Sequence, residues 1–148
     1  MRALPVTWRP RRGRIVAYGM AVVVVIGMVV VAFALPGGSR GFRSADRIGL
    51  VVFGLVAAWF LHILAHPRVS ADETGVTVVN LFRRRRLDWA EIVEVNLREG
   101  DPWVYLDLAD GSVLPAMGLQ TADGEHGRAM ARELRALVRQ RTQTSRDD

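Results

Sequence analysis

The stretch IVAYGMAVVVVIGMVVVAFAL occupies residues Ile15–Leu35, and IGLVVFGLVAAWFLHILA occupies residues Ile48–Ala65. The first has 21 residues and the second 18, and neither contains Asp, Glu, Lys or Arg. At about 1.5 Å per residue, a helix of either length crosses a hydrocarbon layer of roughly 30 Å. A core helix of a soluble protein would keep a polar face, and the first stretch has none. The two stretches therefore predict a membrane α-helical hairpin.

Composition limits what the rest of the 148-residue chain can be. Roughly 80 residues follow the second stretch, enough for one small domain and too few for two. The chain has no cysteine, which excludes disulfides, thiolate metal sites and cysteine nucleophiles. Its 20 basic residues are all Arg, so lysine chemistry such as a Schiff base is excluded as well.

The net charge of +5 lies at the flanks of the two apolar stretches. Residues 1–14 contain five Arg and no acidic residue, whereas residues 66–148 contain twelve Arg and fourteen acidic residues. Positive flanks stay in the cytoplasm, so we expect a multi-pass protein of the plasma membrane with its N-terminus and C-terminal domain in the cytoplasm. The basic balance gives no reason to expect a nucleic-acid partner. The expected interfacial anchors are Trp8, Arg9, Arg11, Arg12 and Arg14.

A cleaved signal peptide over residues 1–34 is the alternative, because Ala32-Phe33-Ala34 resembles a cleavage site. The apolar run is longer than the roughly 7–15 residues of a cleavable signal, which disfavours this alternative. The predicted organisation is a basic cytoplasmic tail (1–14), a first membrane helix (15–35), a short extracytoplasmic linker (36–47), a second membrane helix (48–66), a folded domain (67–141) and a polar tail (142–148).

Within the domain, apolar and polar residues alternate, which is typical of half-buried strands. Strands are expected over Val76–Leu81, Val93–Arg98, Trp103–Leu108 and Ser112–Met117. In the second of these, Val93, Val95 and Leu97 are expected to share the buried face.

A helical period follows the strands, and we expect a helix over about residues 123–141. Asp123 is the expected residue at its N-terminal cap. Its expected buried stripe is Met130, Leu134, Leu137 and Val138.

Three segments of the domain carry a resemblance: RVSADETGVTVVNL at Arg68–Leu81, RRLDWAEI at Arg85–Ile92 and DPWVYLDL at Asp101–Leu108. Over nearly its whole length, both apolar stretches included, the chain resembles the bacterial PH-domain membrane proteins. It looks most like their short two-span branch, labelled low-molecular-weight protein antigen 6. The resemblance implies a small β domain, a PH-like partly closed antiparallel β-barrel capped by a C-terminal α-helix, with one strand missing or very short. It implies no catalytic residues.

The candidate binding residues are two groups. Arg83, Arg84, Arg85 and Arg86 follow a strand, where four guanidinium groups can contact anionic lipid head groups. The alternative is a solvated hairpin whose charges discourage edge-to-edge pairing, since alternation points neighbouring arginines to opposite faces. Trp103 and Tyr105 alternate away from the apolar face, so they either form an exposed aromatic contact or pack under the helix or against the membrane.

Catalytic motifs are missing from the sequence: it has no P-loop, G-x-G-x-x-G, H-E-x-x-H or G-x-S-x-G. His62 and His66 lie one helical turn apart but have no third ligand nearby, so no metal is expected. We expect no catalytic residue and no cofactor. The expected function is a non-enzymatic scaffold or binding module that engages a membrane or envelope partner protein beside the lipid bilayer. The alternative is direct recognition of anionic lipid head groups through Arg83–Arg86, and a homo-oligomer is left open.

Overall fold

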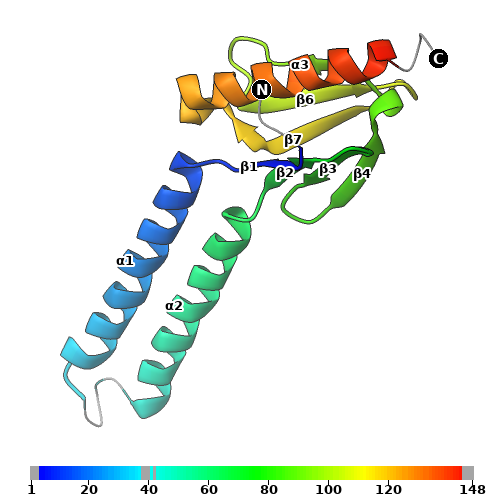
Figure 1. Ribbon diagram of the computed structural model, residues 1–148. Coiled ribbons are helices and arrows are strands. Elements are labelled where there is room, and N and C mark those ends of the chain that lie inside the picture. Colours follow the sequence, from blue (N-terminus) through cyan, green and yellow to red (C-terminus); the bar gives the residue numbers. More distant parts are fainter. Residues whose placement is uncertain (1–3, 38–40, 42, 145–148) are drawn as a thin grey trace. The chain divides into compact units, whose positions relative to one another are not determined.

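The computed structural model describes residues 4–37, 41 and 43–144, which form two compact units (Figure 1). One unit is Arg14–Ala65, and the other joins the N-terminal residues up to Gly13 with the chain from His66 onward. Residues 1–3, residues 38–40 and 42 of the predicted linker, and residues 145–148 of the predicted polar tail lie outside the described residues.

Both predicted apolar helices are present as α1 (Arg12–Ala34) and α2 (Ser44–Leu64). Each is long and apolar enough to cross a membrane, and most of its side chains are exposed, unlike those of a core helix. Gly54 is buried in this unit, and a Cβ there would lie 3.1 Å from the Cβ of Met28. The two helices therefore approach closely at a residue without a side chain, as small residues allow.

The second unit has two antiparallel sheets and a helix. The first sheet has the order β1 (Val6–Trp8), β2 (Arg68–Ala71), β3 (Gly75–Val79) and β4 (Arg84–Asp88). The second has the order β5 (Ile92–Asn96), β6 (Trp103–Leu108) and β7 (Val113–Gln120). Short 3₁₀ turns lie at Trp89–Glu91 and Thr121–Asp123, and α3 (Glu125–Thr144) follows.

The strand β1 corrects the predicted N-terminal tail. Residues 6–8 pair with β2, in the register Trp8 to Val69, and supply the strand that the domain alone lacks. Trp8 is not an interfacial anchor: it is 1% exposed in the core, and its Nε1–H donates to Glu133 Oε2 at 2.9 Å. The predicted domain boundary at residue 67 therefore misses its first strand, and both apolar helices lie within the β1–β2 connection.

The two sheets pack around one apolar core, which includes the expected inward residues of β6: Val104, Leu106 and Leu108. Among the described residues no strand ladder joins the sheets, so the barrel is only partly closed. They approach closely at Gly118, where a Cβ would lie 2.6 Å from the Cα of Arg68. No side chain fits at that crossing, which explains the glycine.

The predicted buried face of the second sheet's first strand is wrong in part. Ile92 and Val95 are buried, whereas Val93 is 65% exposed. The pairing of β5 with β6 shifts between Ile92 and Glu94, which is a bulge. A bulge inserts one residue and so reverses the faces of those that precede it.

The helix α3 confirms the predicted stripe, with Met130, Leu134, Leu137 and Val138 all buried. The predicted role of Asp123 as its cap is wrong. The buried Asp123 carboxylate instead accepts the backbone N–H groups of Arg11 and Arg12, each at 2.7 Å. It thus satisfies free amides at the start of α1, more than a hundred residues away in sequence.

Candidate functional site

The predicted arginine cluster begins in the β3–β4 loop and continues along β4. Arg85 is in register with Val78 and Arg86 with Thr77, so successive side chains leave opposite faces of the strand. The four guanidinium groups therefore do not form one patch.

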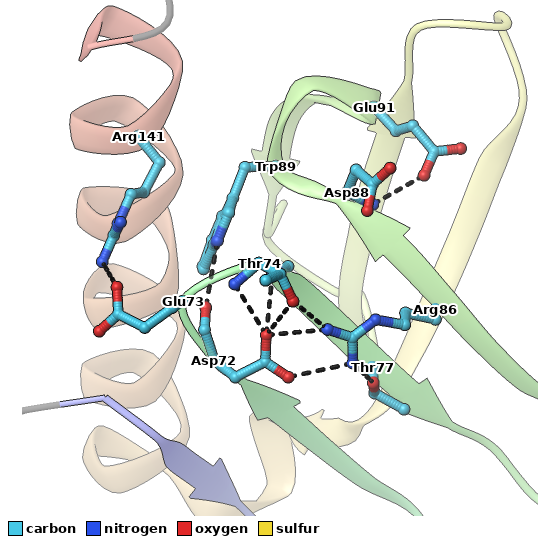
Figure 2. Close-up of polar contacts among 10 residues, drawn as sticks. Asp72, Glu73, Thr74, Thr77, Arg86, Asp88, Trp89, Glu91 and Arg141 are labelled. Atoms are coloured by element: carbon cyan, nitrogen blue, oxygen red, sulfur yellow. Dashed lines mark hydrogen bonds and ion pairs between the residues drawn. The ribbon is translucent and has the colours of Figure 1, made fainter.

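Arg86 is committed to the turn between β2 and β3, as Figure 2 shows. Its guanidinium donates to both carboxylate oxygens of Asp72, at 2.9 and 3.0 Å, and to the hydroxyls of Thr74 and Thr77. This guanidinium, followed by the Thr74 hydroxyl and backbone N–H, holds the pKa of Asp72 well below its usual range. The Trp89 indole N–H donates to the Asp72 carbonyl at 3.1 Å. Arg86 is therefore a structural residue of this turn.

Arg85 lies 3.5 Å from the Asp110 carboxylate, at the tip of the β6–β7 hairpin. The pKa of Asp110 is lowered, mainly by hydrogen bonds from the Ser112 hydroxyl and backbone N–H and less by Arg85. An exposed pair of this length contributes little to stability. It nevertheless draws Arg85 toward the second sheet and away from Arg83 and Arg84.

The remaining arginines lie on what we call the hairpin tip, which consists of loop residues 81–83 between β3 and β4 together with Arg84, the first residue of β4. Arg83 and Arg84 are exposed, and among the described residues no salt bridge to either is found. Phe82 beside them is 80% exposed. Phe82 is not among the residues predicted from the sequence, although it forms an apolar pair with Leu81 directly before the arginine run.

A basic groove of about 450 Å³ lies between the β5–β6 loop and α3. Arg98 comes from the loop, and Arg128, Arg132 and Arg135 come from α3. The other lining residues are Leu97, Glu99, Gly100, Asp101, Thr121 and Ala131. We call this site the α3 groove.

The charges of the α3 groove are only partly neutralised. Arg132 forms an ion pair with Glu125, which lowers the pKa of that carboxyl. Arg135 donates through Nε and Nη2 to the Val95 carbonyl, at 2.9 and 2.6 Å, which fixes its position but leaves its charge. The Asp101 carboxylate accepts the Arg98 backbone N–H at 3.0 Å.

Comparison with known proteins agrees with this architecture. Residues 66–137 match the family model described as a bacterial PH domain. The chain is 31% identical over 144 residues to the uncharacterized proteins Rv1417 of Mycobacterium tuberculosis and Mb1452 of Mycobacterium bovis, covering 93% of this chain and 94% of theirs. The chain belongs to the bacterial PH-domain family. No solved structure matches it.

The family assignment confirms the predicted resemblance, and the structure shows that the PH domain extends beyond the matched segment. The match begins at residue 66, after α2, whereas β1 of the PH domain lies at residues 6–8. This strand is thus present, but it precedes both helices in the sequence. This is the strand that the resemblance implied to be missing or very short.

Trp103 and Tyr105 lie on the second sheet of the PH domain, apart from the arginines of β4. Both side chains are half-buried. Tyr105 is in register with Pro115, and Trp103 with Gln120. The Trp103 indole N–H is buried and has no acceptor among the described residues. A binding role for the two aromatic residues stays a prediction.

The other predicted anchors are four arginines. Three of them, Arg9, Arg11 and Arg12, are exposed, and Arg14 is half-buried. Arg12 also donates to the Ala122 carbonyl at 3.3 Å, so it belongs to the PH domain's own contacts. Anchoring by these arginines stays a prediction. In the described part of the chain, no group of three or more His, Asp or Glu residues could hold a metal ion.

Proposed function

We propose that this protein is a membrane-anchored, non-enzymatic binding module that holds its PH domain at the cytoplasmic face and engages a membrane or envelope partner protein. The observation that carries the proposal is the insertion of both apolar helices into the β1–β2 connection of the domain. A family built on PH domains, which are binding modules, supports the non-catalytic part of it.

The two connections to the helices are short. Only residues 9–11 separate β1 from α1, and only residues 65–67 separate α2 from β2. A domain held by two such tethers stays at the membrane surface and cannot search the cytoplasm. Short linkers raise effective concentrations to about the millimolar range, so even a weak contact with a neighbouring membrane protein would be occupied.

The same insertion argues against cleavage of the first helix as a signal peptide. Removing residues 1–34 would remove β1 and with it the core residues Val6 and Trp8. Deleting a buried Trp side chain alone costs about 3–5 kcal/mol, a large part of the roughly 5–15 kcal/mol that stabilises a typical domain, and cleavage would also remove the whole pairing of β1 with β2. Both helices are therefore retained in the mature protein.

The α3 groove is the surface that we assign to the partner. Four arginines and two acidic residues, Glu99 and Asp101, line it. The Asp101 carboxylate accepts the Arg98 backbone N–H, so positive charge predominates in the groove. Guanidinium groups bind carboxylates in a bidentate manner and fix their geometry. The occupant of the groove is therefore an acidic segment of the partner protein.

Photo-crosslinking in the native membrane tests this assignment. A photo-reactive residue replaces Glu99, which lines the α3 groove, and in a matched variant replaces Glu94, an exposed residue of β5 outside it. We expect a discrete adduct from position 99 alone, joined to a segment rich in Asp or Glu. Arg128→Glu should abolish the adduct, whereas Arg139→Glu, on the same helix but outside the groove, should leave it.

Two results would refute the assignment. One is an adduct that forms equally from both positions or survives Arg128→Glu. The other is a groove-specific adduct with a segment that carries no acidic residue.

A further inference from the structure

The hairpin tip lies at the same end of the first sheet as both helix connections. Arg68, the first residue of β2, is in register with Val79, the last residue of β3. Since β3 runs antiparallel to β2, the chain beyond Val79 continues toward the side from which β2 enters. On the other side of β2, Trp8 is in register with Val69, so β1 leaves the sheet at this end too.

Chain length limits how far this end can be from the end of α2. Residues 65–67 connect Leu64 to Arg68, a path of at most about 14 Å when fully extended. Neighbouring strands lie about 4.8 Å apart, so Val79 is close to Arg68 and shares this limit. The hairpin tip is thus confined to the neighbourhood of the membrane surface if α2 spans the bilayer.

The side chains of the tip suit an interface between water and lipid. Phe82 is 80% exposed, the largest value among the exposed apolar side chains of the described residues outside α1 and α2. Arg83 and Arg84 follow it and are exposed, whereas Arg85 and Arg86 are paired with Asp110 and Asp72. An aromatic ring beside unpaired guanidinium groups is the composition of interfacial membrane anchors.

The tip is held in place from its base. Asn80 Nδ2 donates to the Pro115 carbonyl at 2.7 Å, and the Met117 N–H donates to Asn80 Oδ1 at 3.1 Å. The Asn80 N–H donates to the Arg83 carbonyl at 2.9 Å, which closes the loop with Leu81 and Phe82 at its centre. These contacts tie the loop to β7. Because the loop is already ordered, binding through Phe82 does not have to order it.

We infer that the hairpin tip docks on the bilayer, with Phe82 at the boundary of head groups and acyl chains and with Arg83 and Arg84 on anionic lipid phosphates. The inference rests on the proposed membrane anchoring. It also refines the alternative function, recognition of anionic lipid through Arg83–Arg86, because two arginines and a phenylalanine take the place of a patch of four arginines. The tip would act as a third attachment that fixes the orientation of the PH domain on the membrane.

The absence of cysteine makes a direct test possible, because single cysteines can carry an environment-sensitive NBD fluorophore. The full-length protein is reconstituted in vesicles of zwitterionic lipid with or without anionic lipid. Probes are placed at Phe82→Cys, at Val56→Cys in the middle of α2, and at Val93→Cys, an exposed apolar residue of β5. Quenching by lipids labelled at shallow or deep positions reports the depth of each probe.

We expect deep quenching at position 56, shallow quenching at position 82 and none at position 93. Anionic lipid should increase the quenching at position 82, and Arg83→Ala with Arg84→Ala should remove that increase. The matched variant Arg139→Ala, an exposed arginine of α3, should leave it unchanged.

The other outcomes distinguish docking of the hairpin tip from membrane anchoring by the helices. Lipid quenching at position 56 but not at position 82 overturns docking of the tip and leaves membrane anchoring intact. A probe at position 82 that is shielded from water but not quenched by lipid also overturns it, since protein would then cover the tip. A probe at position 56 that lipid does not quench refutes both.

Discussion

At the scale of single residues, the structure assigns structural roles to side chains whose sequence neighbours place them at the surface. Trp8 lies within a basic segment, yet it fills the core and donates to Glu133. Arg86 lies in an arginine run, yet it closes the Asp72 turn (Figure 2). Both residues stabilise the PH domain through partners that are remote in sequence or on a neighbouring strand.

We predict that Trp8→Ala lowers the free energy of unfolding of the PH domain by about 3–5 kcal/mol, as for other buried aromatic side chains. Chemical unfolding of the full-length protein in detergent, followed by near-ultraviolet circular dichroism, measures this loss. Arg9→Ala changes an exposed neighbour and should stay within about 0.5 kcal/mol of the wild type. If Trp8→Ala left the free energy of unfolding unchanged, the result would contradict the core position of Trp8 and support its predicted role as an interfacial anchor.

A second prediction concerns the pH dependence of stability. The pKa of Asp72 is lowered from its ordinary 3.8 in the folded state, so the unfolded state binds more protons between the two values. The stabilisation is fully present above the ordinary pKa and is lost as the pH falls toward the lowered one. Asp72→Asn should therefore reduce the fall in the thermal midpoint of the full-length protein below about pH 4.

Arg86→Gln removes the main cause of this shift and should reproduce the weaker pH dependence. Arg84→Gln changes the same charge on the same strand but outside the cluster, and should retain the steep dependence of the wild type. Equal slopes in all three variants would contradict the prediction.

At the scale of elements, the PH domain is discontinuous in sequence. The three residues of β1 precede the helices, and the other strands follow them. Since Trp8 and Val69 are opposite each other, the helical pair occupies the place of a hairpin loop. Loop insertions are tolerated where the ends of the insert are close together.

We predict that replacing residues 14–65 with a short Asn-Gly-containing turn yields a soluble, folded PH domain, because this turn suits an antiparallel hairpin. The fragment 66–148, which lacks β1, should fail to fold. Near-ultraviolet circular dichroism and the dispersion of amide resonances distinguish the two. Native-like spectra of the fragment alone would show that β1 is dispensable.

At the scale of the whole molecule, the pairing of β1 with β2 constrains the topology. Strands on either side of the helical pair lie in one sheet, so both ends of the pair must be on the same side of any membrane that it crosses. A segment that crosses the membrane twice meets this requirement, whereas a segment that crosses it once does not. We propose that this side is the cytoplasm, because positive flanks favour that orientation.

We predict that a cysteine at Ser44, the exposed first residue of α2, reacts with a membrane-impermeant maleimide in intact cells. A cysteine at Val93, exposed on the PH domain, should react only after permeabilisation. The cysteine-free wild type serves as the blank. The reverse pattern of labelling would invert the proposed orientation.

Local patterns in the sequence were sufficient for the helices, for most strands and for the family. An uncharged run, a period of two and a period of 3.6 are properties of neighbouring residues, so α1, α2, β6 and the buried stripe of α3 could be predicted. The bulge in β5 could not, because it depends on its pairing with β6.

Only the tertiary structure decided which distant groups meet. Trp8 with Glu133, and the Arg11 and Arg12 amides with Asp123, are separated by more than a hundred residues. No local period encodes such pairs, because they form only when the two sheets and α3 pack together. The same packing divided the arginine run, since Arg85 and Arg86 found carboxylate partners and left Arg83 and Arg84 exposed at the hairpin tip.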